Sequence, residues 1–108
     1  MINVTTNNDL QCNRALAALQ NITDPEIGLN IVDLGLIYQI DFDEAAQRIY
    51  CAMTLTTQFC PMGESITNAV EEIMKDSFPE YEIIITLTFN PRWTHERISV
   101  EGKQFLNY

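Results

Sequence analysis

The sequence has no C-x-x-C pair, and its cysteines are odd in number: Cys12, Cys51 and Cys60 in 108 residues. An odd count without such a pair argues against a disulfide framework and against a self-contained zinc site. A metal held by thiolates would therefore need ligands from a second chain or from other residue types.

Basic residues and long apolar runs are also scarce. Six Lys and Arg stand against fifteen Asp and Glu, which gives a net charge of −9. Nucleic acids and anionic lipids both require a basic face, so neither is expected as a partner. No apolar run approaches the roughly 20 residues of a membrane span, and no basic residue precedes an apolar block at the N-terminus as in a signal peptide. We therefore expect a cytoplasmic protein without a membrane partner.

Hydrophobic periodicity predicts a single domain over residues 9–108, preceded by a disordered N-terminus at residues 1–8. Apolar residues at helical spacing predict one helix over about 9–20, with Asn8 as its cap, and a second over 61–77. Thr94 is predicted to cap a last helix that ends near residue 106.

Strict alternation of apolar and polar residues predicts three strands, over 34–42, 49–55 and 81–89. The short connection between the first two makes them an antiparallel hairpin, and the helical crossover makes the last two parallel. The expected fold is α/β in the order α-β-β-α-β-α, with a three-stranded mixed sheet and helices mainly on one face.

The stretch T-L-T-T-Q-F-C-P-M-G-E, residues 54–64, places Cys60 between the second strand and the second helix. Pro61 suits the first position of a helix, so the free amides that follow should point towards the sulfur. The positive end of the helix dipole favours the thiolate, which is the form that attacks electrophiles and binds soft metals. A cysteine that merely packs in a turn is the alternative, but this position and its neighbours Thr57 and Glu64 favour a functional thiol.

The other two cysteines fall on apolar stripes. Cys51 alternates with Ile49 and Met53 in the second strand, and Cys12 lies on the apolar face of the first helix. Both are therefore predicted to be core residues.

The stretch T-D-P-E-I-G-L-N-I-V-D-L-G-L-I-Y, residues 23–38, carries three acids, Asp24, Glu26 and Asp33. Asp-Pro followed by Glu-Ile-Gly is turn chemistry, and the favoured interpretation of Asp24 is the cap of that turn. For Asp33, binding of backbone amides and an approach to Cys60 are equally supported. Gly35, inside a strand pattern, predicts a bulge or a close backbone approach.

Residues suited to acid–base or phosphate chemistry are few. His95 is the only histidine, and it is expected to be exposed in the first turn of the last helix. The sequence holds no Ser-His-Asp set and no glycine-rich phosphate loop. An enzyme is therefore less well supported than a binding or carrier protein.

D-P-E-I-G-L-N-I-V-D-L-G-L-I-Y together with M-T-L-T-T-Q-F-C-P-M-G-E-S-I resembles the iron–sulfur cluster assembly family that includes SufT and PaaD proteins. The resemblance covers about residues 9–106 and implies the α/β fold with this element order. It also implies Cys60 as the functional thiol, with Asp33 and the pair Asp24 and Glu26 at the matching motif acids. Where relatives continue with Pro-Pro-Trp, this chain has N-P-R-W at 90–93, and it lacks the additional C-terminal cysteines of PaaD-type members.

The resemblance implies a non-catalytic role in cluster assembly or delivery. Cys60 would bind iron or an iron–sulfur cluster transiently, and the isolated protein could hold none. The partners would be the cluster assembly machinery or apo-client proteins, and a homodimer is compatible with the sequence. Two other functions stay open: an enzyme or redox protein that uses the Cys60 thiol, and an adaptor that docks a basic client without metal.

Overall fold

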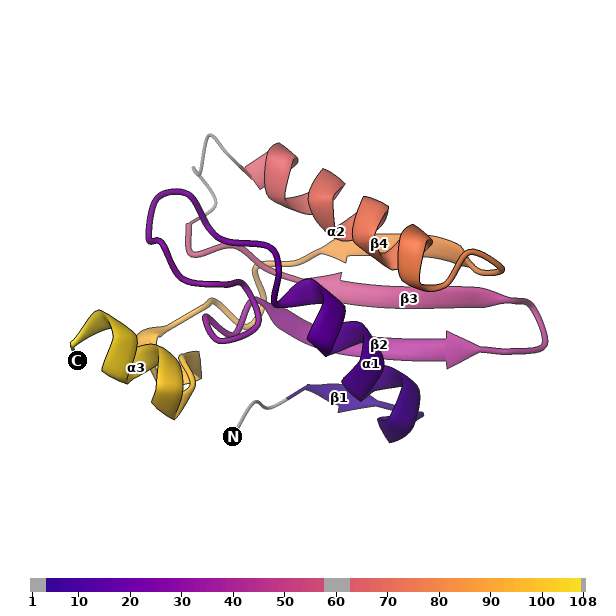
Figure 1. Ribbon diagram of the computed structural model, residues 1–108, viewed down its shortest axis with the longest axis horizontal. Helices are drawn as coiled ribbons and strands as arrows, with labels where there is room; N and C mark the ends of the chain where they lie inside the picture. Colours follow the sequence, from indigo (N-terminus) through magenta and orange to yellow (C-terminus); the bar gives the residue numbers. More distant parts are fainter. Residues whose placement is uncertain (1–3, 58–62, 108) are drawn as a thin grey trace.

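The computed structural model describes residues 4–57 and 63–107, which form a mixed α/β fold with a four-stranded sheet and three α-helices (Figure 1). Within this part of the chain, no helix has the length and apolar character that a bilayer crossing requires. The elements in chain order are β1 (Thr5–Thr6), α1 (Asp9–Leu19), β2 (Ile37–Asp43), β3 (Arg48–Met53), α2 (Gly63–Ser77), β4 (Glu82–Leu87), the 3-10 turn η1 (His95–Arg97) and α3 (Val100–Leu106).

The sheet has the strand order β1-β2-β3-β4. The hairpin β2–β3 is antiparallel and the pair β3–β4 is parallel, as the sequence predicts. The predicted three strands are wrong by one, because Thr5 and Thr6 pair with Gln39 and Ile40 as a parallel edge strand. Thr5 and Thr6 thereby gain backbone hydrogen bonds at the edge of β2.

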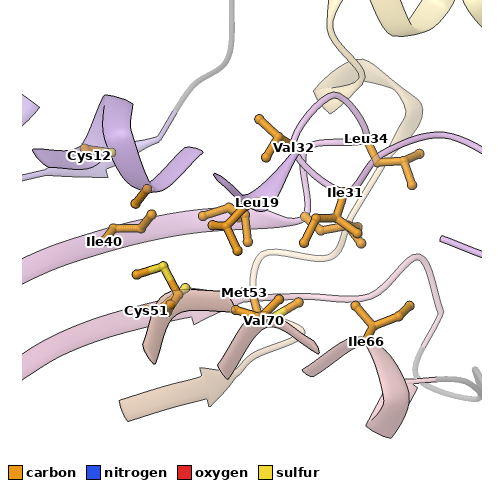
Figure 2. Close-up of a cluster of buried hydrophobic side chains, with 14 of the residues drawn as sticks. Cys12, Leu19, Ile31, Val32, Leu34, Ile40, Cys51, Met53, Ile66 and Val70 are labelled. Carbon is orange, nitrogen blue, oxygen red and sulfur yellow. The ribbon is translucent and has the colours of Figure 1, made fainter. Parts of the chain in front are cut away.

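Helices α1 and α2 lie on one face of the sheet and enclose the core between themselves and β2, β3 and β4 (Figures 1 and 2). The first helix begins as predicted, because Asn8 Oδ1 accepts a hydrogen bond of 3.1 Å from the amide of Gln11. Its buried residues follow the predicted stripe, and so do those of α2. The fully buried positions of the two helices are Cys12, Ala15, Leu19, Val70 and Met74.

The start of β2 departs from the predicted alternation. The strand begins at Ile37, not at Leu34, and the register with β3 shifts between Ile37 and Gln39. This bulge places both Ile37 and Ile40 in the core and leaves Tyr38 half-buried. Leu34, in a turn, and Leu36, between that turn and β2, are both fully buried, and their spacing therefore resembles the alternation of a strand.

The C-terminal segment differs most from the sequence prediction. Thr94 precedes only the 3-10 turn η1 and makes no side-chain cap, while Ser99 starts a separate helix, α3. Ser99 Oγ accepts a hydrogen bond of 2.9 Å from the amide of Gly102 and is the true cap. Figure 1 shows α3 beyond the sheet, beside the end at which β2 begins.

Candidate functional site

Cys60 and its neighbours 58–62 lie outside the described residues, so the candidate site is built from the segments that flank them. On one side, β3 leaves the sheet through Thr54, which is fully buried and donates its amide to Leu36 O at 2.8 Å. On the other side, α2 runs from Gly63. The loop at residues 20–36, which carries the three motif acids, therefore adjoins the exit of β3 through Leu36.

The two described thiols are both core residues, as predicted. Cys12 and Cys51 are free and each is 1% exposed. Figure 2 shows them among the apolar side chains between α1 and the sheet. Burial, with a smaller contribution from Cys12, raises the pKa of Cys51 to about 12, and burial also raises the pKa of Cys12. Both therefore stay protonated at neutral pH and are poor nucleophiles and poor metal ligands.

Asp24 closes a turn within its own segment, as the favoured interpretation predicts. Its side chain is 1% exposed, and Oδ1 accepts a hydrogen bond of 2.9 Å from the amide of Glu26. Its backbone amide donates to Leu29 O at 3.0 Å, and its carbonyl accepts from the amide of Gly28 at 2.8 Å. Gly28 has φ of +85°, a left-handed conformation that favours glycine. The turn at 24–29 is thus held by its own backbone and one carboxylate.

Asp33 instead joins the loop to α3. Its Oδ1 accepts a hydrogen bond of 2.7 Å from Ser99 Oγ, and its Oδ2 accepts one of 2.6 Å from Asn30 Nδ2. The amide of Ser99 also donates to Asp33 O at 2.8 Å. Both carboxylate oxygens are therefore used in positioning the loop against the helix cap. The proximity of Asp33 to Cys60 stays a prediction.

The residues after Asp33 are fixed by side chains from the segment 91–97. Trp93 Nε1 donates to Leu34 O at 2.7 Å, and Arg97 Nε donates to Gly35 O at 2.8 Å. The Arg97 guanidinium also lies over the Tyr38 ring, 4.2 Å from its centroid.

Gly35 permits the close approach of this segment. It has φ of +80°, and a Cβ built on it would lie 2.7 Å from Arg97 Cβ and overlap the Arg97 carbonyl oxygen. The close backbone approach that the sequence predicts at Gly35 is confirmed.

The remaining predicted site residues are exposed. Glu26 lies on the outside of the Asp24 turn, Thr57 ends the described part of the β3 exit, and Glu64 lies in the first turn of α2. His95 is exposed as predicted, with its ring 5.2 Å from that of Trp93. Among residues 4–57 and 63–107, no group of three or more His, Cys, Asp or Glu side chains could hold a metal ion.

Sequence reasoning missed the residues that brace the loop, which are Asn30, Arg97 and Ser99. Nothing in the local pattern around Arg97 predicts that it reaches Gly35 O, 62 positions away in the sequence. For Ser99 a signal was present, because Ser before a helix is a preferred cap. Trp93 packs against the core and also donates a hydrogen bond to Leu34 O.

Comparison with known proteins places this architecture in a family. Residues 13–84 match the model of a family described as iron–sulfur cluster assembly protein. The chain is 34% identical over 88 residues to the Fe-S protein maturation auxiliary factor YitW of Bacillus subtilis, covering 82% of this chain and 85% of that protein. It is 32% identical over 84 residues to the Fe-S protein maturation auxiliary factor SufT of Staphylococcus aureus, covering 76% of this chain and 92% of that protein.

Solved structures agree with the sequence relatives. A domain of unknown function from Bacillus anthracis superposes with a TM-score of 0.82 at 36% identity, covering 88% of this chain and 90% of that one. A conserved hypothetical protein from Thermotoga maritima superposes with a TM-score of 0.75 at 34% identity over the full length of both chains. With this fold, these motifs and these relatives, the chain belongs to the iron–sulfur cluster assembly protein family.

Proposed function

We propose that this protein takes part in the maturation of iron–sulfur proteins by binding iron or a cluster transiently through Cys60 and passing it on. The observation that carries the proposal is the state of the other two thiols. Cys12 and Cys51 are buried in the core with raised pKa values, so Cys60 is the one cysteine left to bind metal at neutral pH. The relatives are named Fe-S protein maturation auxiliary factors, which supports iron or an iron–sulfur cluster as the metal that Cys60 would bind.

A single thiol sets the manner of binding. Iron–sulfur clusters are held by four thiolates or by thiolates with imidazoles, and one cysteine supplies one of these ligands. In this proposal the cluster or iron is cargo, and the remaining ligands come from the assembly machinery or from the apo-client protein that receives it. A binding site that is incomplete in one chain favours release to a client that offers a full ligand set.

In this proposal, some residues of the two motif segments hold the loops in place, and others form the polar surface that a partner contacts. The carboxylates of Asp24 and Asp33 are engaged by the backbone amide of Glu26 and by Ser99, which suits positioning more than metal binding. Glu26, Thr57 and Glu64 are exposed and are proposed as the polar rim that a partner meets. Free thiols in the core are also consistent with work in a reducing compartment such as the cytoplasm.

Anaerobic reconstitution with iron and sulfide tests the proposal. The wild-type protein is expected to develop a sulfur-to-iron absorption band in the visible range, and Cys60→Ala is expected to lose it. Cys51→Val is the matched control, because it removes a thiol of the core and should leave the band unchanged.

Three other outcomes would overturn the proposal. A band of equal strength in Cys60→Ala would assign metal binding to other ligands. Thiol turnover of a small substrate without metal would indicate an enzyme, while client capture that survives Cys60→Ala and needs no iron would indicate an adaptor.

A further inference from the structure

The two edges of the sheet are finished differently. At one edge, β1 pairs with β2, and the side chain of Asn7 extends that pairing by accepting from the amide of Phe42 at 2.8 Å and donating to its carbonyl at 3.0 Å. At the other edge, β4 pairs with β3 on one side, and no described strand pairs with its other side. An unpaired edge is a template for another strand.

The backbone groups that face this open edge can be assigned. The amides of Glu82 and Thr88 donate to carbonyls of Gln47 and Met53, each at 2.8 Å, so even-numbered residues of this strand face β3. Because successive residues of a strand alternate in direction, the amides and carbonyls of Ile83, Ile85 and Leu87 face outwards. The edge therefore offers a regular row of donors and acceptors.

The side chains along this edge are uncharged and mostly apolar. From Ile83 to Phe89 the sequence is I-I-I-T-L-T-F, without a charged residue, in a chain with 21 charged residues. Leu87 is 43% exposed and Phe89 is 36% exposed. Natural edge strands are usually protected by charge, proline or a covering segment, so an uncharged edge of this length indicates a partner.

A shallow hollow of about 220 Å³ lies between this edge and α2. Thr67, Asn68 and Glu71 of α2 line one side, and Ile85 and Leu87 of β4 line the other. A strand added to β4 would place its inward side chains over this hollow, because residues opposite each other in adjacent strands point to the same face.

We propose that the occupant is the β4 strand of a second copy, paired antiparallel across a two-fold axis, so that two four-stranded sheets form one continuous sheet. The strip from Ile83 to Phe89 admits this occupant because it carries no charge, although the remaining surfaces of the two acidic chains repel each other. A basic client would be drawn to the acidic surface of a chain with net charge −9, not to its uncharged strip. Antiparallel pairing sets apolar residues opposite apolar residues and keeps the two copies of Glu82 at opposite ends, away from each other.

This arrangement is independent of the proposed role of Cys60. Helix α2 begins at the end of the sheet where β3 and β4 finish, as Figure 1 shows. In the antiparallel pair the two copies of Glu64 would therefore lie at opposite ends of the joined sheet.

Sedimentation velocity over a range of protein concentrations tests the pairing. The wild type is expected to dimerise, and more tightly at about 0.5 M than at about 0.05 M salt, because salt screens repulsion between two acidic chains. Leu87→Lys places a charge on the edge and should weaken dimerisation by more than about tenfold. Leu10→Lys is the matched control, since Leu10 is 81% exposed on α1 and the charge change is identical.

Amide hydrogen exchange by NMR locates the interface. At high protein concentration the amides of Ile85 and Leu87 should gain protection of about tenfold or more, and Leu87→Lys should remove the gain at Ile85. Ile84 and Thr86 face β3 and should be protected under every condition. A wild type that stays monomeric, equal dissociation of the two lysine variants, or a dimer with unprotected edge amides would each overturn the proposal.

Discussion

The loop between α1 and β2 contains two segments with similar ingredients and different construction. Each has an aspartate and a glycine with positive φ: Asp24 with Gly28, and Asp33 with Gly35. The Asp24 turn is closed by its own backbone and by one carboxylate bond to the amide of Glu26. The Asp33 segment has a local partner in Asn30, and it adds partners from more than 60 positions away, at Ser99 and Arg97.

The role of an acid can be predicted from the neighbouring sequence when its hydrogen-bond partners lie in the same segment, and not when they lie far away along the chain. The Asp24 turn could fold as a short peptide unit, and its side-chain role is visible in the Asp-Pro-Glu pattern. The Asp33 segment has local hydrogen bonds of its own, and Ser99 and Arg97 hold it in addition. We therefore expect the C-terminal segment to stabilise the loop that leads into β2 and adjoins the exit of β3.

The largest expected effect comes from the two glycines. Gly35→Ala should destabilise the protein by about 3 kcal/mol, because it adds a clash with Arg97 to the strain of a positive φ. Gly28→Ala meets no atom within 4 Å and should cost only the backbone strain, about 1 kcal/mol. Urea unfolding of both variants measures the difference. Equal losses would mean that the Arg97 contact does not constrain the loop.

The next effect tests the bond between Asp33 and Ser99. Asp33→Ala should lower the free energy of unfolding by about 2 kcal/mol, because it removes two hydrogen bonds to a carboxylate. Ser99→Ala should cost about 1 to 2 kcal/mol through the lost cap and the lost bond.

A double-mutant cycle sharpens this result. The combination Asp33→Ala with Ser99→Ala should be less destabilising than the sum of the two by about 1 kcal/mol, since both remove the same bond. Asp24→Ala with Ser99→Ala is the control and should be additive within about 0.5 kcal/mol, because these residues share no partner in the described hydrogen bonds. Coupling of equal size in both cycles would remove the distinction between the two segments.

The smallest effect is expected for Asp24→Asn. The amide oxygen of Asn can accept the same hydrogen bond from the amide of Glu26, so the free energy of unfolding should change by less than about 1 kcal/mol. Urea unfolding beside the wild type measures it. A loss as large as that of Asp33→Ala would show that the negative charge of Asp24, and not its turn geometry, matters to the fold.

Sequence patterns predicted what depends on local periodicity. The apolar stripes of α1 and α2, the β2–β3 hairpin, the parallel β3–β4 pair and the burial of Cys51 are all confirmed. The missed strand β1 is two residues long and pairs with residues more than 30 positions away, so it has no period to detect. The bulge in β2 lies between Ile37 and Gln39, just after Gly35, the residue at which the sequence predicts a bulge or a close backbone approach.

Only part of the candidate site could be predicted from the sequence. Motif chemistry identified the Asp24 turn and the close approach at Gly35. Whether Asp33 acts on the backbone or near Cys60 depends on where distant segments fold. Its bond to Asn30, three positions away, is local, but its bond to Ser99 arises only in the tertiary structure. The role of Cys60 stays a prediction, carried by its motif and by the burial of the other two thiols.

The most direct test of the central claim, that Cys60 is the one usable thiol, is native-state alkylation with iodoacetamide read out for each cysteine by mass spectrometry. At neutral pH we expect rapid labelling of Cys60 and very slow labelling of Cys12 and Cys51, because burial limits access and raises both pKa values. Labelling of all three in urea confirms that each is chemically competent. Labelling of Cys51 as fast as Cys60 in the folded protein would contradict the account.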